Sequence, residues 1–318
     1  MIPYFFAQYR PLIAFIGVLA AFGTTCLMLS KCSGFLPKDQ GRDFAVEGKK
    51  SAGKPRGAGI IFVLVFAAAV LLFADLSTEL CVYLILVVIE MLTGFFDDTA
   101  EKPWGELKKG ILDLVVAAAV AVTCYNYNGS SIGFLGKEFT LHPVVFILCA
   151  IVLVWVSINV TNCADGVDGL SGTLTIITLT TIYVAGNILG KGGDLSFPIL
   201  LFIVCILGYL WYNATPSRLL MGDAGSRAMG VFISIAVLKS GNPFLYIPVA
   251  FVLIVDGGLG LVKVSLIRAF KIHIMKNILT PLHDHVRKRL EWSNTQTVFR
   301  FAIIQIVISV ATVYMLLL

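Results

Sequence analysis

The stretch PVVFILCAIVLVWVSINVTNCADGVDGL, Pro143 to Leu170, decides which kind of fold this chain can adopt. Its first part, Pro143–Val160, is apolar and nearly long enough to cross the hydrocarbon core of a bilayer as a helix. Asn162, Asp165 and Asp168 then follow at intervals of three, before another apolar run begins. Such spacing at the end of a helix places these side chains along one side of a helical turn. The stretch therefore predicts polar chemistry at the edge of a membrane.

The composition of the whole chain is that of an integral membrane protein. Of its 318 residues, 58% are hydrophobic and only 14% are charged, and the mean hydropathy is +0.90. A soluble protein of this length could not remove so much apolar surface from water. Because lipid offers no partner to an unpaired backbone group, the apolar runs are expected to be helices. Runs of sufficient or nearly sufficient length are Leu12–Leu29, Gly57–Ala74, Leu80–Phe96, Ile111–Tyr125, Pro143–Val160, Gly169–Leu189, Phe197–Tyr212, Ala224–Leu238, Pro243–Val264 and Val298–Leu318.

These runs predict an all-α polytopic membrane protein with about ten transmembrane helices in a single domain, residues 1–318. The runs that begin at Ile111 and Ala224 are short, and they carry Asp113 and Arg227 near their ends. The opening MIPYFFAQYRPL has neither a basic start nor a small-residue cleavage site, so the first run is expected to be retained as a span. The cysteines have no metal-like spacing, and no disulfide or zinc framework is indicated.

The distribution of basic residues predicts the orientation in the membrane. All but four of the 24 Lys and Arg residues lie in the odd-numbered loops or at the span ends beside them; the exceptions are Arg10, Lys137, Lys191 and Lys239. By the positive-inside rule, the odd-numbered loops are cytoplasmic and both termini are outside. The net charge of +5 is explained by this topology and by attraction to anionic membrane lipids. Nothing in it indicates nucleic-acid binding.

Acidic residues and histidines gather on the predicted cytoplasmic side. They are Asp97 and Asp98 in the third loop, Asp165 and Asp168 in the fifth, Asp223 in the seventh, Asp256 in the ninth span, and His283, Asp284 and His285 in the ninth loop. Crowded carboxylates in a partly desolvated cleft repel one another unless a cation or a proton offsets their charge. Mg²⁺ is the natural candidate, because it takes one or two carboxylates and fills its other positions with water and phosphate oxygens. The pattern predicts phosphate chemistry on the cytoplasmic face.

Each of these residues alone has an ordinary structural explanation. Loop aspartates are often helix caps or solvated charges, His285 resembles a surface histidine, and the basic run Arg287–Arg289 is interpreted as a topology signal. Glu90 shares a helical face with Asp97 and is either a buried polar contact or a support for the site. Their convergence at one membrane edge favours function, because ionisable groups there are costly.

Four segments together resemble a known family. They are GFFDD (94–98), NVTNCADGVDGL (159–170), WYNATPSRLLMGDAGS (211–226) and TPLHDHVRKRLEWSNTQTVFRF (280–301). In order and approximate spacing they are similar to the polyprenyl-phosphate N-acetylhexosamine-1-phosphate transferases, and most closely to the phospho-N-acetylmuramoyl-pentapeptide transferase branch. The resemblance runs from about Gly41 to Phe301, which is nearly the whole chain.

The resemblance implies a ten-helix, Mg²⁺-dependent enzyme of the bacterial plasma membrane. It would move phospho-MurNAc-pentapeptide from UDP-MurNAc-pentapeptide to undecaprenyl phosphate, releasing UMP and forming lipid I in peptidoglycan synthesis. The catalytic residues carried over are Asp97, Asp98, Asp223, His283 and His285; the substrate-binding residues are Lys109, Asn162, Asp165 and Asp168; the metal ligands are Asp223 and Asp168.

This sequence departs from the family pattern at two places. The family usually reads PLHHH in the ninth loop, and here Asp284 replaces the middle histidine. The segment GKKSAGKPRGAG (48–59), which contains the loop Lys49–Gly59, matches the early KxGTPTMGG signature only in part. Pro55 and Gly59 fit that signature, while Lys54 and Arg56 replace threonines. A mechanism that needs three histidines therefore does not carry over.

The reaction that the resemblance implies joins two anions, and two routes stay open. A lipid phosphate oxygen attacks the β-phosphate of the nucleotide sugar, with UMP as the leaving group. Asp97 is the candidate base, although a phosphate whose second pKa is near 6 hardly needs one at neutral pH. A covalent route through Asp97 or Asp98 is the alternative.

Two rival functions are considered. A transferase of GlcNAc-1-phosphate to polyprenyl phosphate is the nearest, and TPLHxH followed by WSNTQTVFRF favours the muramoyl-pentapeptide branch over it. An ion-coupled transporter would also hold intramembrane acids, but near the midplane and in matching repeats. The sequence leaves the oligomeric state open, with a homodimer among the alternatives.

Overall fold

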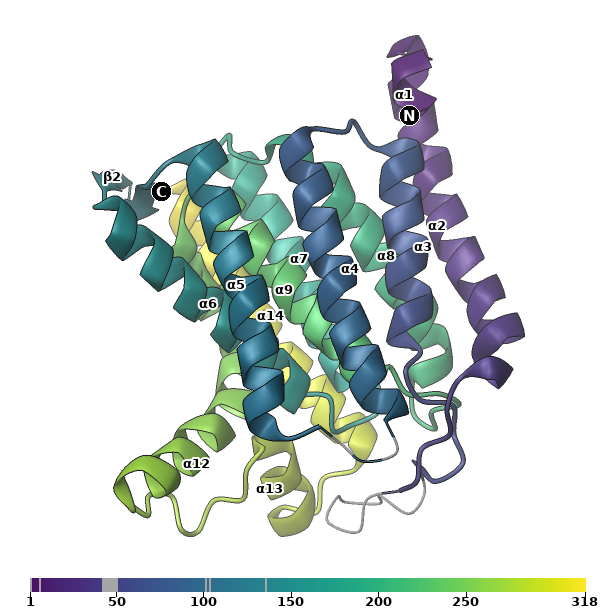
Figure 1. Ribbon diagram of the computed structural model, residues 1–318, viewed down its shortest axis with the longest axis vertical. Coiled ribbons are helices and arrows are strands. Elements are labelled where there is room, and N and C mark those ends of the chain that lie inside the picture. Colours follow the sequence, from purple (N-terminus) through teal and green to yellow (C-terminus); the bar gives the residue numbers. More distant parts are fainter. Residues whose placement is uncertain (1, 6, 42–50, 101, 103, 135) are drawn as a thin grey trace.

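Long helices run side by side through most of the protein, as the computed structural model shows (Figure 1). The structure describes residues 2–5, 7–41, 51–100, 102, 104–134 and 136–318. Gly48, Lys49 and Lys50 of the partial signature lie outside these residues. The longer helices are α2 (Arg10–Cys32), α3 (Gly59–Phe73), α4 (Thr78–Thr99), α5 (Glu106–Asn128), α6 (Pro143–Cys163), α7 (Leu170–Ile188), α8 (Ser196–Asn213), α9 (Gly222–Lys239), α12 (Leu259–Phe270), α13 (Leu282–Arg289) and α14 (Asn294–Leu317). Shorter helical turns are α1 (Ile2–Phe5), η1 (Ala7–Tyr9), η2 (Ser33–Phe35), η4 (Gly193–Leu195), η5 (Pro243–Leu245), α10 (Tyr246–Val249), α11 (Phe251–Leu253) and η6 (Ile254–Gly258).

The apolar runs predicted from the sequence all fall on helices. Among the described residues, 6 helices are long and apolar enough to cross a membrane: Arg10–Phe35, Thr78–Thr99, Pro143–Cys163, Leu170–Ile188, Gly193–Asn213 and Asn294–Leu317. A bent pair, Pro243–Val249 with Phe251–Phe270, raises the number to 7. The polytopic helical class is therefore confirmed. The count of ten crossings stays a prediction, because α3 is shorter and α5 and α9 are not among the helices that pass.

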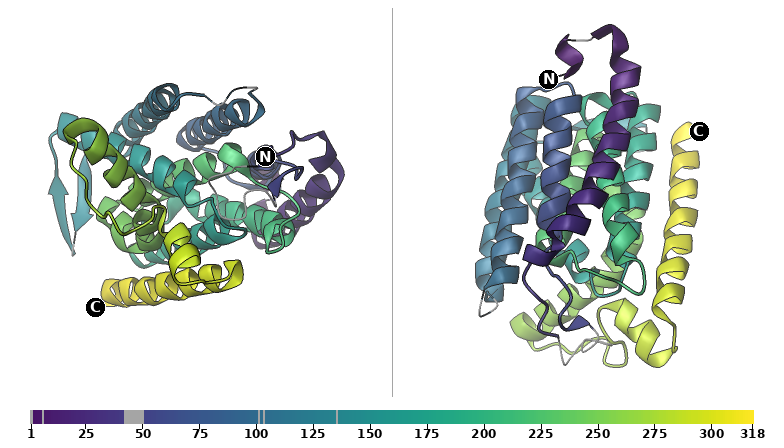
Figure 2. Two further views of the ribbon diagram at one scale, coloured as in Figure 1. Left: turned by 90° about the horizontal axis from the view of Figure 1, so that it is seen from below. Right: turned by 90° about the vertical axis from the view of Figure 1, so that its right-hand side faces the viewer.

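Both chain ends lie at the end of the bundle opposite α12 and α13 (Figure 2). Two short strands, β1 (Ser131–Phe134) and β2 (Lys137–Thr140), form an antiparallel hairpin at this end (Figure 1). The sequence predicted no strands, and the hairpin corrects the all-α assignment at this one place. The placement of the termini on the same side agrees with the predicted topology. Which side faces the cytoplasm stays a prediction.

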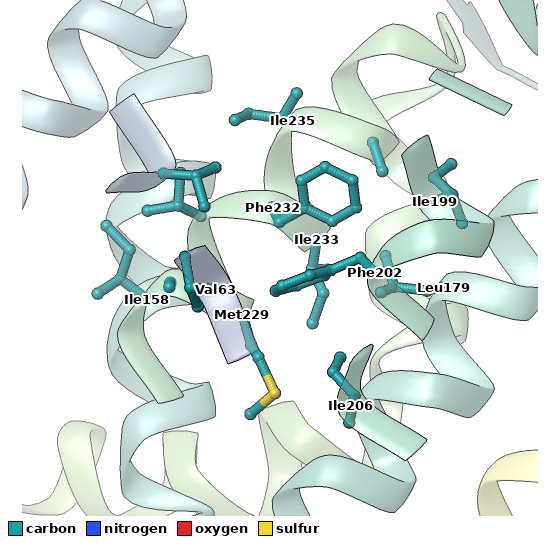
Figure 3. Packing of buried hydrophobic residues seen from close by; sticks show 14 of the residues in the cluster. Val63, Ile158, Leu179, Ile199, Phe202, Ile206, Met229, Phe232, Ile233 and Ile235 are labelled. Atoms are coloured by element: carbon teal, nitrogen blue, oxygen red, sulfur yellow. The ribbon is translucent and has the colours of Figure 1, made fainter. Parts of the chain in front are cut away.

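Helix α9 forms the centre of the bundle. Its residues from Ala224 to Leu238 are all buried, and it packs against α3, α4, α5, α6 and α7. A helix that is apolar on every face can be stable only when neighbours cover all of it. Phe232 of α9 lies 4.7 Å from the Phe202 ring and 5.2 Å from the Phe66 ring, measured between centroids. Figure 3 shows Phe232 and Phe202 among Val63, Ile158 and other aliphatic side chains. The frame that carries Asp223 is therefore firmly held.

The ninth predicted span is bent, and the prediction of a single helix over Pro243–Val264 was wrong. The two halves differ in direction by 74°, and the π-helical turn η6 lies at the start of the second half. No residue of α12 is buried, and Figure 1 shows this helix pointing away from the bundle. The chain breaks at Ala250, where Gln305 of α14 binds the backbone groups on either side of the break: the Val252 amide donates to Gln305 Oε1 at 2.9 Å, and Gln305 Nε2 donates to the Pro248 carbonyl at 3.0 Å. In the second half, the side chain of Asp256, within η6, binds His283 of α13. The bend brings the ninth loop under the other loops.

Candidate active site

Asp97, Asp98 and Asp223 lie where α4 ends and α9 begins. The amide of Ala224 donates a hydrogen bond of 3.2 Å to Asp98 Oδ2, so this carboxylate binds the first turn of α9. A negative group at a helix N-terminus is favoured because the first amides there have no helical partner. Gly222 has a left-handed φ of 68°, and a Cβ at this position would lie only 2.1 Å from Asp98 Oδ2. Glycine is therefore required for the two acidic motifs to meet.

Arg56 joins three carboxylates at this point. Its Nε donates to Asp98 Oδ1 at 2.8 Å, its Nη1 lies 3.0 Å from Asp39 Oδ1, and its Nη2 lies 3.5 Å from Asp223 Oδ1. The rigid fork of a guanidinium suits such multiple contacts, which an ammonium could not make in one plane. The sequence treated Arg56 as a departure and did not single out Asp39. The partial signature therefore contributes a central residue of the site.

The charges of Arg56 and Asp39 stabilise each other. Burial alone would lower the pKa of Arg56, but the carboxylates of Asp98, Asp39 and Asp223 raise this pKa above its usual value. For Asp39, burial acts to raise the pKa, while hydrogen bonds from Ser51 and Arg56 outweigh it and leave the pKa below its usual value. Both groups are therefore charged at neutral pH.

Lys109 is the second cation of the site. Its Nζ lies 2.5 Å from Asp97 Oδ2 and 3.4 Å from Asp223 Oδ2. The other oxygen of Asp97 accepts a hydrogen bond of 2.7 Å from the Trp104 amide. Both oxygens of Asp97 are thus occupied, and Lys109 is placed between the two predicted catalytic aspartates.

We call Asp39, Asp97, Asp98 and Asp223, together with Arg56 and Lys109, the acidic cluster. Four carboxylates and two cations leave it with a formal charge of −2. The side chain of Asp223 is 13% exposed, while those of the other three carboxylates are 5% exposed or less. Asp223 is therefore the carboxylate of the cluster most open to a ligand.

The fifth loop does not continue as a helix, which corrects one prediction. Helix α6 ends at Cys163 and α7 begins at Leu170, so Asn162, Asp165 and Asp168 do not share one helical face. Gly169 has a left-handed φ of 83° and precedes α7. Its amide donates to the Asn213 side chain at 2.8 Å, which holds the turn against α8.

The polar residues of the fifth loop have separate partners. Asn162 Nδ2 donates to Ser226 Oγ of α9 at 3.0 Å. The Ser217 amide donates to Asp168 Oδ2 at 3.1 Å, and Lys54 Nζ donates to Ser217 Oγ at 2.9 Å. Asp165 is half-buried in the turn between Asn162 and Asp168. The loop therefore lies beside the acidic cluster and is tied to the seventh loop.

His283 and Asp256 form a buried pair. The His283 amide donates to Asp256 Oδ1 at 2.7 Å, and His283 Nδ1 lies 2.8 Å from Asp256 Oδ2. The opposite edge of the ring packs on the fifth loop, where a Cβ at Gly166 would lie 2.2 Å from His283 Nε2. Asp256 was among the clustered acids of the sequence, but a partner in a later loop could not be assigned to it.

His285 and Asp284 face different partners. The Leu279 amide donates to His285 Nδ1 at 3.2 Å, so a neutral ring carries its proton on Nε2. Asp284 Oδ1 lies 3.7 Å from Arg287 Nη1 and 3.9 Å from His283 Nε2. Arg287, interpreted from the sequence as a topology signal, is buried and donates to the Gly166 carbonyl at 3.2 Å.

The described residues contain no group of three or more His, Cys, Asp or Glu side chains arranged to hold one metal ion. Mg²⁺ usually needs only one or two protein carboxylates. Asp98 and Asp223, which share the Arg56 guanidinium, fit that smaller requirement. Among the described residues, Asp168 accepts from the Ser217 amide, whereas Asp223 lies beside Arg56 and Lys109, and their role as a metal-binding pair stays a prediction.

Comparison with known proteins adds two findings. Residues 80–241 match the family model described as glycosyl transferase family 4. The chain is 38% identical to the phospho-N-acetylmuramoyl-pentapeptide-transferase of Treponema pallidum (strain Nichols), over 95% of this chain and 89% of that protein. It is 28% identical to the enzyme of that name from Clostridium acetobutylicum, over 81% of this chain and 83% of that protein. It is 27% identical to the enzyme of that name from Helicobacter acinonychis, over 93% of this chain and 92% of that protein.

Proposed function

We propose a role for each charged residue of the site from one premise, that this chain belongs to the phospho-N-acetylmuramoyl-pentapeptide-transferases of glycosyl transferase family 4. The protein is a multi-pass membrane transferase of peptidoglycan synthesis. It transfers phospho-MurNAc-pentapeptide from UDP-MurNAc-pentapeptide to a polyprenyl phosphate, forming lipid I and UMP. We infer that the acceptor is undecaprenyl phosphate, and that the acidic cluster faces the cytoplasm in the bacterial plasma membrane.

The formal charge of −2 on the acidic cluster supports a divalent cation at this site. Asp223 would hold Mg²⁺ because it is the most exposed carboxylate, with Asp98 beside it, and Asp168 is a further candidate ligand. When bound, the ion would screen the pyrophosphate and stabilise the charge that develops on the leaving UMP.

Asp97 orients Lys109 in this proposal and does not act as a base. Both of its oxygens are occupied, by the Trp104 amide and by Lys109 Nζ. A lipid phosphate, with a second pKa near 6, is mostly ionised at neutral pH and can attack the β-phosphate directly. Lys109 and Arg56 then offer positive charge to the two anions that must approach each other. This assignment favours the direct route over a covalent one.

The two histidines divide their work. His283 is 3% exposed and is held between Asp256 and Gly166, so we assign it to holding the fifth and ninth loops together. His285 is half-buried and has its Nε2–H free of the Leu279 contact. We assign His285 as the donor to a phosphate or sugar oxygen of the substrate. Asn162 and Asp165 lie in the loop that His283 holds, and we assign them to substrate binding.

The experiment that tests this function uses purified protein with undecaprenyl phosphate and Mg²⁺. UDP-MurNAc-pentapeptide and UDP-GlcNAc are offered separately, and UMP release is measured. We expect UMP only with the first donor, together with a lipid-linked product. UMP release with UDP-GlcNAc instead would show that the donor is UDP-GlcNAc. UMP release with neither donor would overturn the proposed function.

A further inference from the structure

Three charged side chains that the proposed reaction does not use meet inside the helix bundle. Glu90 of α4, Asp113 of α5 and Arg227 of α9 are 0%, 1% and 2% exposed. Arg227 Nη2 donates to Asp113 Oδ1, and Arg227 Nε lies 3.4 Å from Glu90 Oε1. Asn159 Nδ2 of α6 donates to Asp113 Oδ2 at 3.1 Å. Charged groups at such depth are costly and seldom lack a role.

The charge of this triad is balanced only if one carboxyl group keeps a proton. Two ionised carboxylates and one guanidinium would leave a net charge of −1 in a dry interior. Both oxygens of Glu90 are buried, and no donor among the described residues reaches them with good hydrogen-bond geometry. The carboxyl group of Asp113 lies within hydrogen-bond reach of Glu90, and Thr93 lies beside it. A proton on Glu90 removes the net charge and supplies an O–H that can donate to Asp113. Arg227 then pairs with Asp113 alone.

The triad lies directly beneath the acidic cluster, on the same helices. Each helix carries a residue of the site and a triad residue or triad partner on one face: Asp97 and Glu90 on α4, Lys109 and Asp113 on α5, Asn162 and Asn159 on α6, and Asp223 and Arg227 on α9. The separations are seven, four, three and four residues, which are close to whole turns of 3.6 residues. A contact in the deeper layer therefore fixes the rotation and height of the same four helices that bear the site.

We propose that Glu90, Asp113 and Arg227 form a proton-holding triad whose role is to position Asp97, Lys109 and Asp223 for the reaction. They are positioning residues, because they act on the reaction through the helices that carry the acidic cluster, with Arg227 one turn below Asp223 on α9. The inference rests on the proposed function for its kinetic test, while the protonation of Glu90 can be tested without any turnover.

The kinetic test compares Glu90→Gln with Glu90→Leu. The glutamine amide can donate to Asp113 as the protonated acid does, so Glu90→Gln should keep kcat within about twofold of wild type. Leucine cannot donate, and Arg227→Met leaves Asp113 without its cation. For these two variants we expect kcat to fall at least ~10-fold, with KM for the nucleotide sugar within about threefold, because small misplacements of catalytic groups reduce rate steeply.

A matched control comes from the end of α9 that is remote from the acidic cluster. Lys239 Nζ of α9 lies 2.7 Å from Glu79 Oε2, at the end remote from the acidic cluster. Lys239→Met also breaks an ion pair of α9 and should lower thermal stability in detergent while leaving kcat of the folded protein unchanged. If the triple variant Glu90→Leu, Asp113→Leu, Arg227→Met folds and keeps wild-type kcat, the triad is only structural and the proposal fails.

Infrared spectroscopy provides the readout that is independent of activity. Wild-type protein at neutral pH should show a carbonyl band of a protonated carboxyl group that is absent from Glu90→Gln. An identical spectrum for the two proteins would overturn the protonation of Glu90. If this band is present but wild-type protein releases no UMP, the proposed function fails while the protonated triad stands.

Discussion

Replacing Arg56 by methionine tests the electrostatic design of the site most directly. The change leaves Asp39, Asp98 and Asp223 without the guanidinium that lies 2.8 to 3.5 Å from each of them, and it changes the formal charge of the cluster from −2 to −3. Each contact is worth about 4 kcal/mol of Coulomb energy at an effective dielectric constant near 20. Desolvation offsets much of this, and removal of one partner from a buried ion pair typically costs about 3–5 kcal/mol. We therefore expect a loss of about 3 kcal/mol or more in the free energy of unfolding.

Thermal unfolding in detergent measures this loss in the free energy of unfolding. Repeating the measurement with Mg²⁺ tests whether the loss comes from the added negative charge. A loss of this size should lower Tm by about 6 °C or more, since one kcal/mol shifts Tm by about 2–4 °C in chains of 150–250 residues. Because the variant cluster carries an additional negative charge, added Mg²⁺ should raise its Tm more than that of wild type. Arg56→Lys keeps the positive charge but lacks the planar guanidinium, so its Tm should lie between those of wild type and Arg56→Met. An Arg56→Met protein with wild-type Tm and kcat, or with an equal response to Mg²⁺, would refute this reasoning.

Four further outcomes are expected. Excess EDTA should stop UMP release and Mg²⁺ should restore it; unchanged release would rule out the divalent cation. Asp223→Ala should leave a folded protein with kcat lower by about 10²-fold or more, as expected for losing a metal ligand, and substantial activity in the purified variant would make that assignment wrong. Asp284→His should remain active with an unchanged alkaline limb of the rate profile, because the close carboxylate of His283 is Asp256, 2.8 Å from its Nδ1, whereas Asp284 lies 3.9 Å from its Nε2; a downward shift of that limb would show that Asp284 keeps a histidine cationic. Asp39, whose folded pKa is lowered, contributes stability above the unfolded pKa of about 3.9 that is lost as pH falls through the lower folded pKa. Asp39→Asn should therefore remove an acid-side step from the pH dependence of Tm, and a profile identical to wild type would contradict this.

The helices were predictable because apolar length is a local property of the sequence. The run Pro143–Val160 and the other apolar runs can be recognised as helices from their length and hydrophobicity alone, without knowledge of a distant partner. The bend at Ala250 was not predictable in this way. Its backbone groups are bound by Gln305, which lies 53 residues beyond Val252 in the chain, and the ninth apolar run does not identify that partner.

The site was predictable by residue type and side, but not by pairing. Asp97, Asp98 and Asp223 could be placed at one membrane edge because hydropathy fixes where spans end. Arg56 could not be recognised as their shared partner, because it looks like any other cytoplasmic basic residue under the positive-inside rule. The fifth loop failed for a different reason. Spacing of three suggested a continued helix, whereas Gly169 adopts a left-handed conformation that sets the start of the next helix after the turn.

The burial of α9 on every side limits which parts of the protein can move during turnover. A helix packed by five neighbours cannot shift without disturbing all of them, so Asp223 is a stationary point during turnover. Substrates that arrive from two phases, one from water and one from lipid, must then be admitted by movement elsewhere. The segments with the fewest buried contacts are the freest to move, and α12 is a long helix with no buried residue. Ligands that pin α12 against the bundle should therefore slow the enzyme without touching any residue of the acidic cluster.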